Sequence, residues 1–348
     1  MKGLRQYLTP FAPDQSGAVS VLYELGGLVV ICDAGGCAGN VCGFDEPRWH
    51  TMRSAVFSAG LRDMDAIMGR DKKLVAELVT AARALEPDFA AVVGTPVPAV
   101  IGTDYTALRR MAEREISIPV LTVDTNGMQL YDKGAEKAYL ALFKTFAAEK
   151  LPVKPGLISV LGVNPLDMSM LDADKAIASV LISQGAGEVR CYGMGGSLED
   201  VRRASEAEKI IVVSPSGLKA ARYLEQTFGT PFEVRDPLAA LLLEKAGLPD
   251  DLAGKKILVC DQLVRADSMR KELLSRGAAA VTAATWFMPC PPCQAAGDVR
   301  LREEDDFTAL AENYDIVIGD PVLQSLIPCF AGAFIPIVSF PVSGKLMR

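Results

Sequence analysis

Short runs of apolar, β-branched residues alternate along the chain with longer stretches in which apolar residues recur at helical spacing. Gly27–Cys32, Phe89–Gly94 and Pro119–Asp124 are runs of the first kind. The helical stretches Asp71–Leu85 and Thr103–Glu115 lie between them. Strands that are apolar throughout and are separated by helices are typical of parallel sheets covered by helices. The pattern therefore predicts an α/β fold.

The same alternation recurs twice more, after two segments rich in proline and glycine, LPVKPG (151–156) and GLPDDLAGK (247–255). Domains of about 100–150 residues are common. We therefore predict three α/β domains with mainly parallel sheets, at residues 1–152, 153–250 and 251–348. The later predicted strands are Leu157–Val163, Glu188–Tyr192, Lys209–Ser214, Lys256–Asp261, Ala279–Thr285 and Asp315–Gly319. Ligands of open α/β sheets gather beyond the carboxyl ends of the strands, which draws attention to the loops there.

Charge and histidine content narrow the possible functions. The chain of 348 residues has 36 Lys and Arg against 43 Asp and Glu, a net charge of −7. Without a basic patch, a nucleic-acid partner is not expected. His50 is the only histidine, which excludes a three-histidine zinc centre or a facial triad within one chain. Any metal must be held mainly by thiolates.

The apolar segments do not predict a membrane protein. The opening residues, MKGLRQYLTPFAPDQ, lack the apolar segment of a secretory signal, and no uncharged run is long enough for a membrane helix. We therefore expect a cytoplasmic protein whose cysteines are reduced, metal-bound or buried. Three of the eight, Cys191, Cys260 and Cys329, lie in or beside apolar runs and are predicted to be packed in the core.

Three cysteines, Cys32, Cys37 and Cys42, lie close together directly after the first predicted strand, in the sequence CDAGGCAGNVCG. Small residues such as Gly36 allow backbone amides to approach an iron–sulfur cluster and to donate hydrogen bonds to its sulfurs. The loop is therefore a candidate cluster site, with Cys37 and Cys42 as ligands. Cys32 is a further candidate, or it completes a buried strand, as cysteine often does.

A second candidate pair, Cys290 and Cys293, forms the motif CPPC at the end of the segment TAATWFMPCPPC. Such a pair is redox-active, binds metal or forms a structural turn. The sequence does not predict a helix directly after it, which disfavours thioredoxin chemistry. The pair is a candidate for lining or ligating a cavity in the third domain.

Six segments carry a resemblance to a known family: VVICDAGGC, VVGTPVPAVIGTDY, IPVLTVDTNGM, KIIVVSPSGLKAARYLEQTFGTPFEV, KKILVCDQLVRADSMRKELLSRG and YDIVIGDPVLQ. Together they resemble the nitrogenase component 1 superfamily. This superfamily includes nitrogenase MoFe-protein subunits, their assembly scaffolds, the dark-operative protochlorophyllide and chlorophyllide reductases, and the reductive cyclase of coenzyme F430 synthesis. The resemblance places Cys37 on a cluster ligand and implies three Rossmann-like domains.

The chain departs from the pattern of this superfamily at several ligand positions. The first cluster cysteine would fall near Phe11–Ala12 and the third at Thr95, and the cysteine that holds the large nitrogenase cofactor would fall near Val213–Ser214. No cysteine stands at any of them, and the late histidine ligand is missing too. We therefore do not expect an iron–molybdenum cofactor of the nitrogenase type or a P-cluster of normal ligation.

The remaining thiols suggest a shared cluster. A [4Fe–4S] cluster needs about four thiolates, and two chains would supply them from Cys37 and Cys42 of each. The sequence thus predicts a homodimer, or a heterodimer with a similar subunit, that holds an inter-subunit [4Fe–4S] cluster. The resemblance implies an oxidoreductase that takes electrons from an ATP-dependent iron–sulfur protein and reduces a small molecule or a tetrapyrrole-like substrate. The alternatives are a non-catalytic scaffold for metallocluster assembly and a metal-free, ligand-binding homologue.

Overall fold

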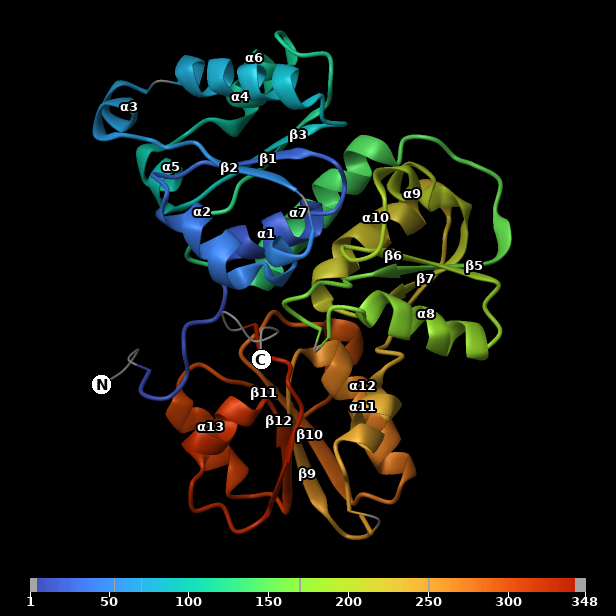
Figure 1. The fold of residues 1–348 in the computed structure, drawn as a ribbon. Helices are drawn as coiled ribbons and strands as arrows, with labels where there is room; N and C mark the ends of the chain where they lie inside the picture. Colours follow the sequence, from blue (N-terminus) through green and yellow to red (C-terminus); the bar gives the residue numbers. More distant parts are fainter. Residues whose placement is uncertain (1–4, 53, 70, 169, 250, 342–348) are drawn as a thin grey trace.

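The computed structural model describes residues 5–52, 54–69, 71–168, 170–249 and 251–341. The chain forms three lobes, each built on one sheet with helices packed against it (Figure 1). Every strand pair within these sheets is parallel. The predicted fold class is thus confirmed. None of the helices in the described ranges is both long and apolar enough to span a membrane.

The first lobe contains a four-stranded sheet in the order β2-β1-β3-β4. Both faces of this sheet are covered by helices, which explains why its inner strands are apolar throughout. One face packs against α1 and α7, and the other packs against α4 and α6. The strands are β1 (Leu28–Ile31), β2 (Ala55–Ser58), β3 (Ala90–Val93) and β4 (Val120–Val123). The helices are α1 (Asp14–Leu22), α2 (Gly36–Asn40), α3 (Asp63–Met68), α4 (Asp71–Leu85), α5 (Pro96–Ile101), α6 (Tyr105–Glu113) and α7 (Tyr131–Phe146).

Helices α1 and α7 cross at very close range, because a glycine faces the backbone of the other helix at each contact. A Cβ atom on Gly17 would overlap the carbonyl oxygen of Tyr131, and one on Gly134 would overlap that of Asp14. A larger residue at either position would push the helices apart. The crossing therefore fixes α1, and the loop that follows β1, against the rest of the molecule.

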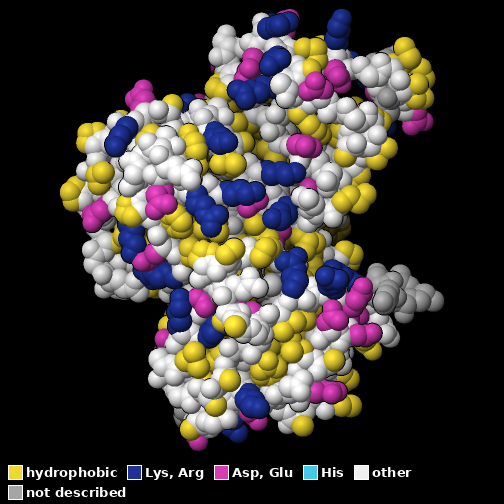
Figure 2. All heavy atoms as spheres, turned by 180° about the vertical axis from the view of Figure 1, so that it is seen from behind, with side chains coloured by type: hydrophobic (Ala, Val, Ile, Leu, Met, Phe, Trp, Pro, Cys, Tyr) yellow, Lys and Arg dark blue, Asp and Glu magenta, His cyan; other side chains and the backbone are white. Residues whose placement is uncertain are grey.

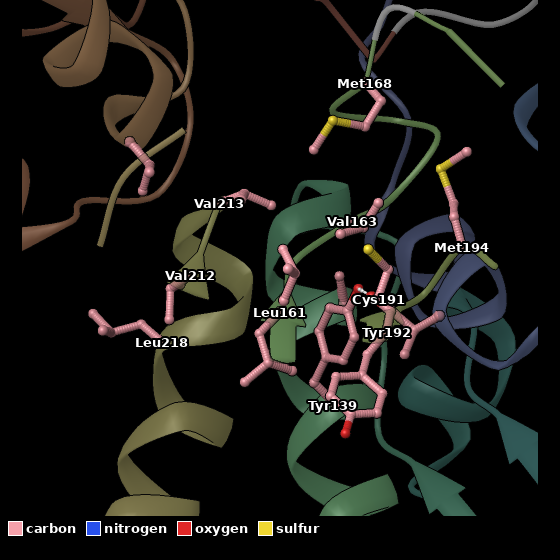
Figure 3. Close-up of a cluster of buried hydrophobic side chains, with 14 of the residues drawn as sticks. Tyr139, Leu161, Val163, Met168, Cys191, Tyr192, Met194, Val212, Val213 and Leu218 are labelled. Carbon is pink, nitrogen blue, oxygen red and sulfur yellow. Dashed lines mark hydrogen bonds between the residues drawn. The ribbon is translucent and has the colours of Figure 1, made fainter. Parts of the chain in front are cut away.

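The second lobe has the strand order β6-β5-β7-β8, and α7 packs against it as well. In its core (Figure 3), Tyr139 of α7 donates a hydrogen bond of 2.9 Å to the carbonyl oxygen of Tyr192. Phe143, one turn further along α7, packs edge-on against the ring of Tyr192. The elements are β5 (Lys154–Leu161), α8 (Ala173–Ser183), β6 (Glu188–Tyr192), α9 (Leu198–Arg202), β7 (Ala207–Val212), α10 (Leu218–Phe228) and β8 (Phe232–Val234).

The third lobe has the strand order β11-β10-β9-β12-β13, and the segment before α1 packs onto it. Phe11 lies among the rings of Trp286, Phe287 and Phe340. The carboxylate of Glu304 accepts hydrogen bonds from the backbone amides of residues 6–8. The elements are α11 (Ala239–Lys245), β9 (Lys256–Cys260), α12 (Leu263–Ser275), β10 (Ala280–Thr285), β11 (Val299–Arg300), α13 (Glu304–Ala311), β12 (Ile316–Gly319) and β13 (Ala333–Pro336).

The structure corrects one of the three predictions of packed cysteines. Cys191 and Cys260 are buried, as predicted, but Cys329 is exposed. Pro328 lies in a turn before β13, and this turn carries Cys329 to the surface. Cys329 is therefore a free surface thiol, well suited as a control in experiments on the other cysteines.

Candidate metal site

The segment after β1 turns sharply into a helix that carries both candidate ligands. Gly35 adopts a left-handed conformation (φ 116°), which glycine tolerates far better than other residues, and α2 starts at the next residue. Cys37 lies in α2, and Cys42 lies in the π-helical turn Val41–Asp45 that continues it. Both thiols are partly exposed. The predicted loop is thus a short helix that presents two accessible thiols.

A buried carboxylate holds the first turn of this segment. The Oδ2 atom of Asp33 accepts a hydrogen bond of 2.8 Å from the amide of Ala38, and its Oδ1 accepts one of 2.5 Å from Ser58 Oγ. Ser58 ends strand β2, at the edge of the first sheet. Asp33 therefore ties the Cys37 turn to the neighbouring strand.

A second carboxylate holds the turn that carries Cys42. Asp45 Oδ2 accepts hydrogen bonds of 2.7 Å from Ser16 Oγ of α1 and from Asn40 Nδ2. Because α1 is fixed by its crossing with α7, this contact fixes the end of the segment. The two cysteines therefore lie on a backbone held at both ends.

Arg48 follows this segment and is almost completely buried. Its guanidinium forms a bidentate pair with Glu46, with both N···O distances 2.7 Å, and contacts Glu24 Oε1 at 2.7 Å. It also donates to the carbonyl oxygens of Ser20 (2.6 Å) and Gly193 (2.7 Å), and Gly193 belongs to the second lobe. Arg48 thus links the cysteine segment to α1 and to the second lobe.

The surroundings of both thiols favour their protonated form. Burial and the negative charge of Asp33 raise the pKa of Cys37, although a hydrogen bond with Thr95 acts in the opposite direction. Burial, Glu46 and Asp33 raise the pKa of Cys42. Binding of a metal at these thiols must therefore displace their protons, and metal affinity is expected to increase with pH.

Exposed apolar side chains lie at the same edge of the first sheet as the two cysteines and form what we call the apolar rim. Val100 is 82% exposed, Met128 80% and Ile67 74%, which is high for residues of this type. They lie on α5, on the loop before α7 and on α3, and α3 contacts α5. The other members are Phe44, Met64, Met68 and Ile101. In Figure 2, hydrophobic side chains also gather at the tip of the first lobe. Such a patch is typical of a surface that contacts another protein.

The sequence matches the family described as "Nitrogenase component 1 type Oxidoreductase" over residues 16–240, which is more than half of the chain. This chain belongs to that family. Two solved structures titled "Nitrogenase Cp1", at pH 6.5 and pH 5, share its fold with TM-scores of 0.71 and 0.69. They are 14% and 17% identical to it, and each match covers 98% of this chain and 88% or 85% of the other.

Two curated relatives carry the name "Nitrogenase iron-molybdenum cofactor biosynthesis protein NifE". NifE of Bradyrhizobium diazoefficiens is 26% identical over 223 residues, which is 60% of this chain and 39% of that protein. NifE of Clostridium pasteurianum is 27% identical over 178 residues, which is 51% of this chain and 38% of that protein. The matches thus span less than half of the length of either relative.

Within this nitrogenase component 1 type family member, Thr95 lies directly beside Cys37. Thr95 is fully buried, its hydroxyl donates a hydrogen bond of 2.7 Å to the carbonyl oxygen of Cys32, and its side chain is hydrogen-bonded to Cys37. The resemblance placed a cluster cysteine at this position. Phe11, where it placed another, packs instead in the apolar core of the third lobe.

Cys32 is not brought together with the other two cysteines. Side chains alternate between the two faces of a strand, and Cys32 points to the same face as Leu28 and Val30. It packs there in the apolar core beneath α4 and α6, whereas Cys37 packs against the core on the opposite face. Burial raises the pKa of Cys32 to about 12, with Asp33 adding to the effect. This environment fits a packed thiol.

Cys290 and Cys293 are both buried and lie in the third lobe, after β10. In the part of the chain that the structure describes, no three or more His, Cys, Asp or Glu residues are placed so that they could hold one metal ion. Within the described ranges of one chain, Cys37 and Cys42 are thus not joined by a third such ligand.

Sequence reasoning missed Asp33, Asp45, Arg48 and the apolar rim. The sequence gives one local signal for these anchors, the charged run Asp45–Arg48 (DEPR) directly after the cysteines. Their partners, however, lie far away along the chain, on β2, α1 and the second lobe.

Proposed function

We propose that this chain is the cluster-binding subunit of a nitrogenase-like reductase. In this proposal, two chains share one [4Fe–4S] cluster, which Cys37 and Cys42 of each chain ligate. The observation that carries the proposal is the pair of partly exposed thiols on an anchored helix, at the same edge of the first sheet as the apolar rim. The partner is a second copy of this chain or a similar subunit.

The number of thiols supports a shared site. A [4Fe–4S] cluster takes about four thiolates, and each chain offers two at this location. Across a two-fold axis the same surface of each chain faces its partner. Two thiols from each chain then give four thiols at one site, and the apolar rim of each chain covers that of the other. The glycines of the segment leave room, because a Cβ added at Gly36, Gly39 or Gly43 would meet no atom within 4 Å. When two chains are present, the four thiolates and the open space beside the glycines thus fit a [4Fe–4S] cluster.

When bound, the cluster would accept and pass on single electrons. The family resemblance supports an ATP-dependent iron–sulfur protein as the electron donor and a small molecule or a tetrapyrrole-like compound as the substrate. The protein itself holds the ligating thiols in place through Asp33 and Asp45 and excludes water from them with the apolar rim. All eight cysteines are free thiols, which supports a reducing compartment such as the cytoplasm.

Anaerobic purification of the full chain tests the proposal. The expected product is a brown dimer with about four iron and four sulfide per pair of chains and the absorption and EPR signals of a [4Fe–4S] cluster. A colourless dimer, or iron bound by a monomer, would contradict a shared cluster. A colourless protein would favour the metal-free, ligand-binding alternative.

The apolar rim provides a separate prediction. Val100→Asp places a charge in the apolar rim, within the proposed interface, so we expect the dimer to dissociate and the iron to be lost. Ile182→Asp is the matched control, since Ile182 is an exposed apolar residue of α8 in the second lobe. Sedimentation equilibrium and iron analysis of both variants check this prediction. A Val100→Asp protein that stays dimeric with full iron would show that the rim does not hold the partner.

A scaffold that holds a cluster for assembly or delivery is a second candidate. It is favoured by the two relatives, whose name describes a cofactor biosynthesis protein. The discriminating experiment incubates the cluster-loaded dimer either with an ATP-dependent iron–sulfur reductase or with an apo-acceptor protein. ATP-dependent oxidation of the donor with substrate turnover supports the reductase. Transfer of iron and sulfide to the acceptor supports the scaffold.

A further inference from the structure

The third lobe contains a second pair of thiols, Cys290 and Cys293, which the proposed cluster does not use. We propose that these two residues form a reversible dithiol–disulfide couple, which a low-molecular-weight disulfide such as oxidised glutathione converts to an intramolecular disulfide. This inference is independent of the proposed cluster, because the pair lies in another lobe.

A tight turn brings the two cysteines close together. The motif forms a 3-10 turn at Pro291–Cys293, in which the amide of Cys293 donates a hydrogen bond of 2.9 Å to the carbonyl oxygen of Cys290. The thiols are hydrogen-bonded to each other. Since two prolines separate the cysteines, the backbone has little freedom to move the thiols apart. Formation of the disulfide therefore needs only a small local movement.

The rest of the lobe holds this turn in place. Arg270 of α12 donates a hydrogen bond of 3.2 Å to the carbonyl oxygen of Cys293 and forms a bidentate pair with Asp298, at 2.6 and 2.9 Å. Asp298 in turn accepts from the amides of Ala283 and Ala295. The turn is therefore anchored at its carboxyl-terminal end, at Cys293 and in the segment that leads to β11.

The surroundings give the two thiols different roles. A hydrogen bond from Cys293 lowers the pKa of Cys290, with the positive charge of Arg222 on α10 assisting, whereas the pKa of Cys293 is raised. Because the positive charge of Arg222 favours a thiolate at Cys290, we assign the attack to Cys290 and the completion of the disulfide to Cys293. Pro291 and Pro292 are exposed, so the turn lies at the surface while its sulfurs face inward.

Because the Cys290 sulfur is buried, the exchange begins with a local opening of the exposed turn that admits glutathione, and it then balances in two steps. The Cys290 thiolate attacks one sulfur of oxidised glutathione, which breaks the glutathione disulfide, releases one glutathione thiolate and forms a mixed disulfide. Cys293 then loses its proton and attacks the Cys290 sulfur, which releases the second glutathione. The protein loses two electrons and two protons, and two molecules of reduced glutathione are formed.

The structure favours this chemistry over the other two possibilities for a CPPC motif. A metal site is disfavoured, because no third ligand joins the pair among the residues described. Thioredoxin-like catalysis on other proteins is disfavoured, because the sulfurs are buried and the chain continues from Cys293 into β11 rather than into a helix. An internal couple needs neither a further ligand nor access for a protein substrate.

The test is a glutathione redox titration of the full-length reduced protein, followed by acid quenching, alkylation and mass spectrometry of the peptide with residues 290–293. We expect a reversible loss of two hydrogen atoms from this peptide. A tenfold increase in the equilibrium ratio of oxidised glutathione to the square of reduced glutathione should raise the disulfide-to-dithiol ratio about tenfold. In Cys293→Ser, the reaction should stop at a mixed disulfide on Cys290.

Cys329→Ser is the matched control, and it should titrate like the wild type. Cys329 itself serves as an internal standard, because its exposed thiol forms a mixed disulfide with glutathione. The proposal would be overturned if the pair stays fully alkylated under conditions that modify Cys329. It would also be overturned if the purified protein retains a metal ion that protects both thiols. If the Cys293→Ser protein does not fold, the glutathione titration of the wild-type protein still tests the proposal.

Discussion

Cys37→Ser is expected to reduce the iron content of the anaerobically purified protein from about four atoms per dimer to nearly none. A serine hydroxyl deprotonates far less readily than a thiol and is a poor cluster ligand. A shared site would lose two of its four ligands at once, because each dimer carries the substitution twice. Cys42→Ser should have the same effect. Iron and sulfide analysis, with the EPR spectrum of the reduced protein, checks both variants.

Two control variants separate the loss of a ligand from a general loss of structure. Cys329→Ser changes an exposed thiol in another lobe and should retain full iron. Cys32→Ala removes a buried sulfur beneath α4 and α6, so it should lower stability by about 1 kcal/mol yet retain the iron. Full iron content in both Cys37→Ser and Cys42→Ser would refute the shared cluster. If iron is lost in Cys32→Ala but retained in Cys37→Ser and Cys42→Ser, the metal is bound at Cys32 and not at the two proposed ligands.

Arg48→Met is expected to have the largest effect on stability, a loss of about 3–5 kcal/mol in the region around the cysteine segment. The substitution leaves Glu46 and Glu24 without their buried counter-charge and leaves the carbonyl oxygens of Ser20 and Gly193 without this donor. Hydrogen exchange measures the effect directly. The amide of Thr51, which donates to the carbonyl oxygen of Arg48, should exchange much faster.

The control for this variant is Arg109→Met, which removes an exposed ion pair with Glu113 on α6. Such pairs contribute about 0–1 kcal/mol, so exchange near Thr51 should not change. The double variant Arg48→Met/Glu46→Gln should recover part of the loss, because one of the unpaired buried charges is removed. If the amide of Thr51 exchanges at the same rate in Arg48→Met as in the wild type, the guanidinium of Arg48 does not hold this segment.

Regular patterns made much of the fold predictable. Helix α4 was predicted with its observed bounds, Asp71–Leu85, because one apolar stripe and polar flanks define it. The buried central strands of the first and third lobes were predicted within one residue, whereas the predicted bounds of β5 and β7 are two or three residues too late along the chain. Helix α1 was missed, since all of its residues are buried and no polar face marks it. The edge strands β2 and β8 were missed because they are short and only partly buried.

The candidate site was predictable in its chemistry but not in its support. Glycine-rich spacing identified Cys37 and Cys42, and strand alternation explains why Cys32 packs in the core instead. The anchoring of the segment depends on Ser58, Ser16 and Gly193, which are distant along the chain, so no local pattern indicates it. The ligand assignment itself stays a prediction that the iron analysis will test.

The double role of α7 has a consequence for motion. Through Gly134 it touches the backbone of α1, and through Tyr139 and Phe143 it packs into the sheet of the second lobe. Relative motion of the first two lobes would therefore have to break these contacts. The buried salt bridge of 2.8 Å between Arg265 on α12 and Asp236, and the hydrogen bond of 2.9 Å from Gln262 Nε2 to the carbonyl oxygen of Val213, hold the third lobe to the second in the same way.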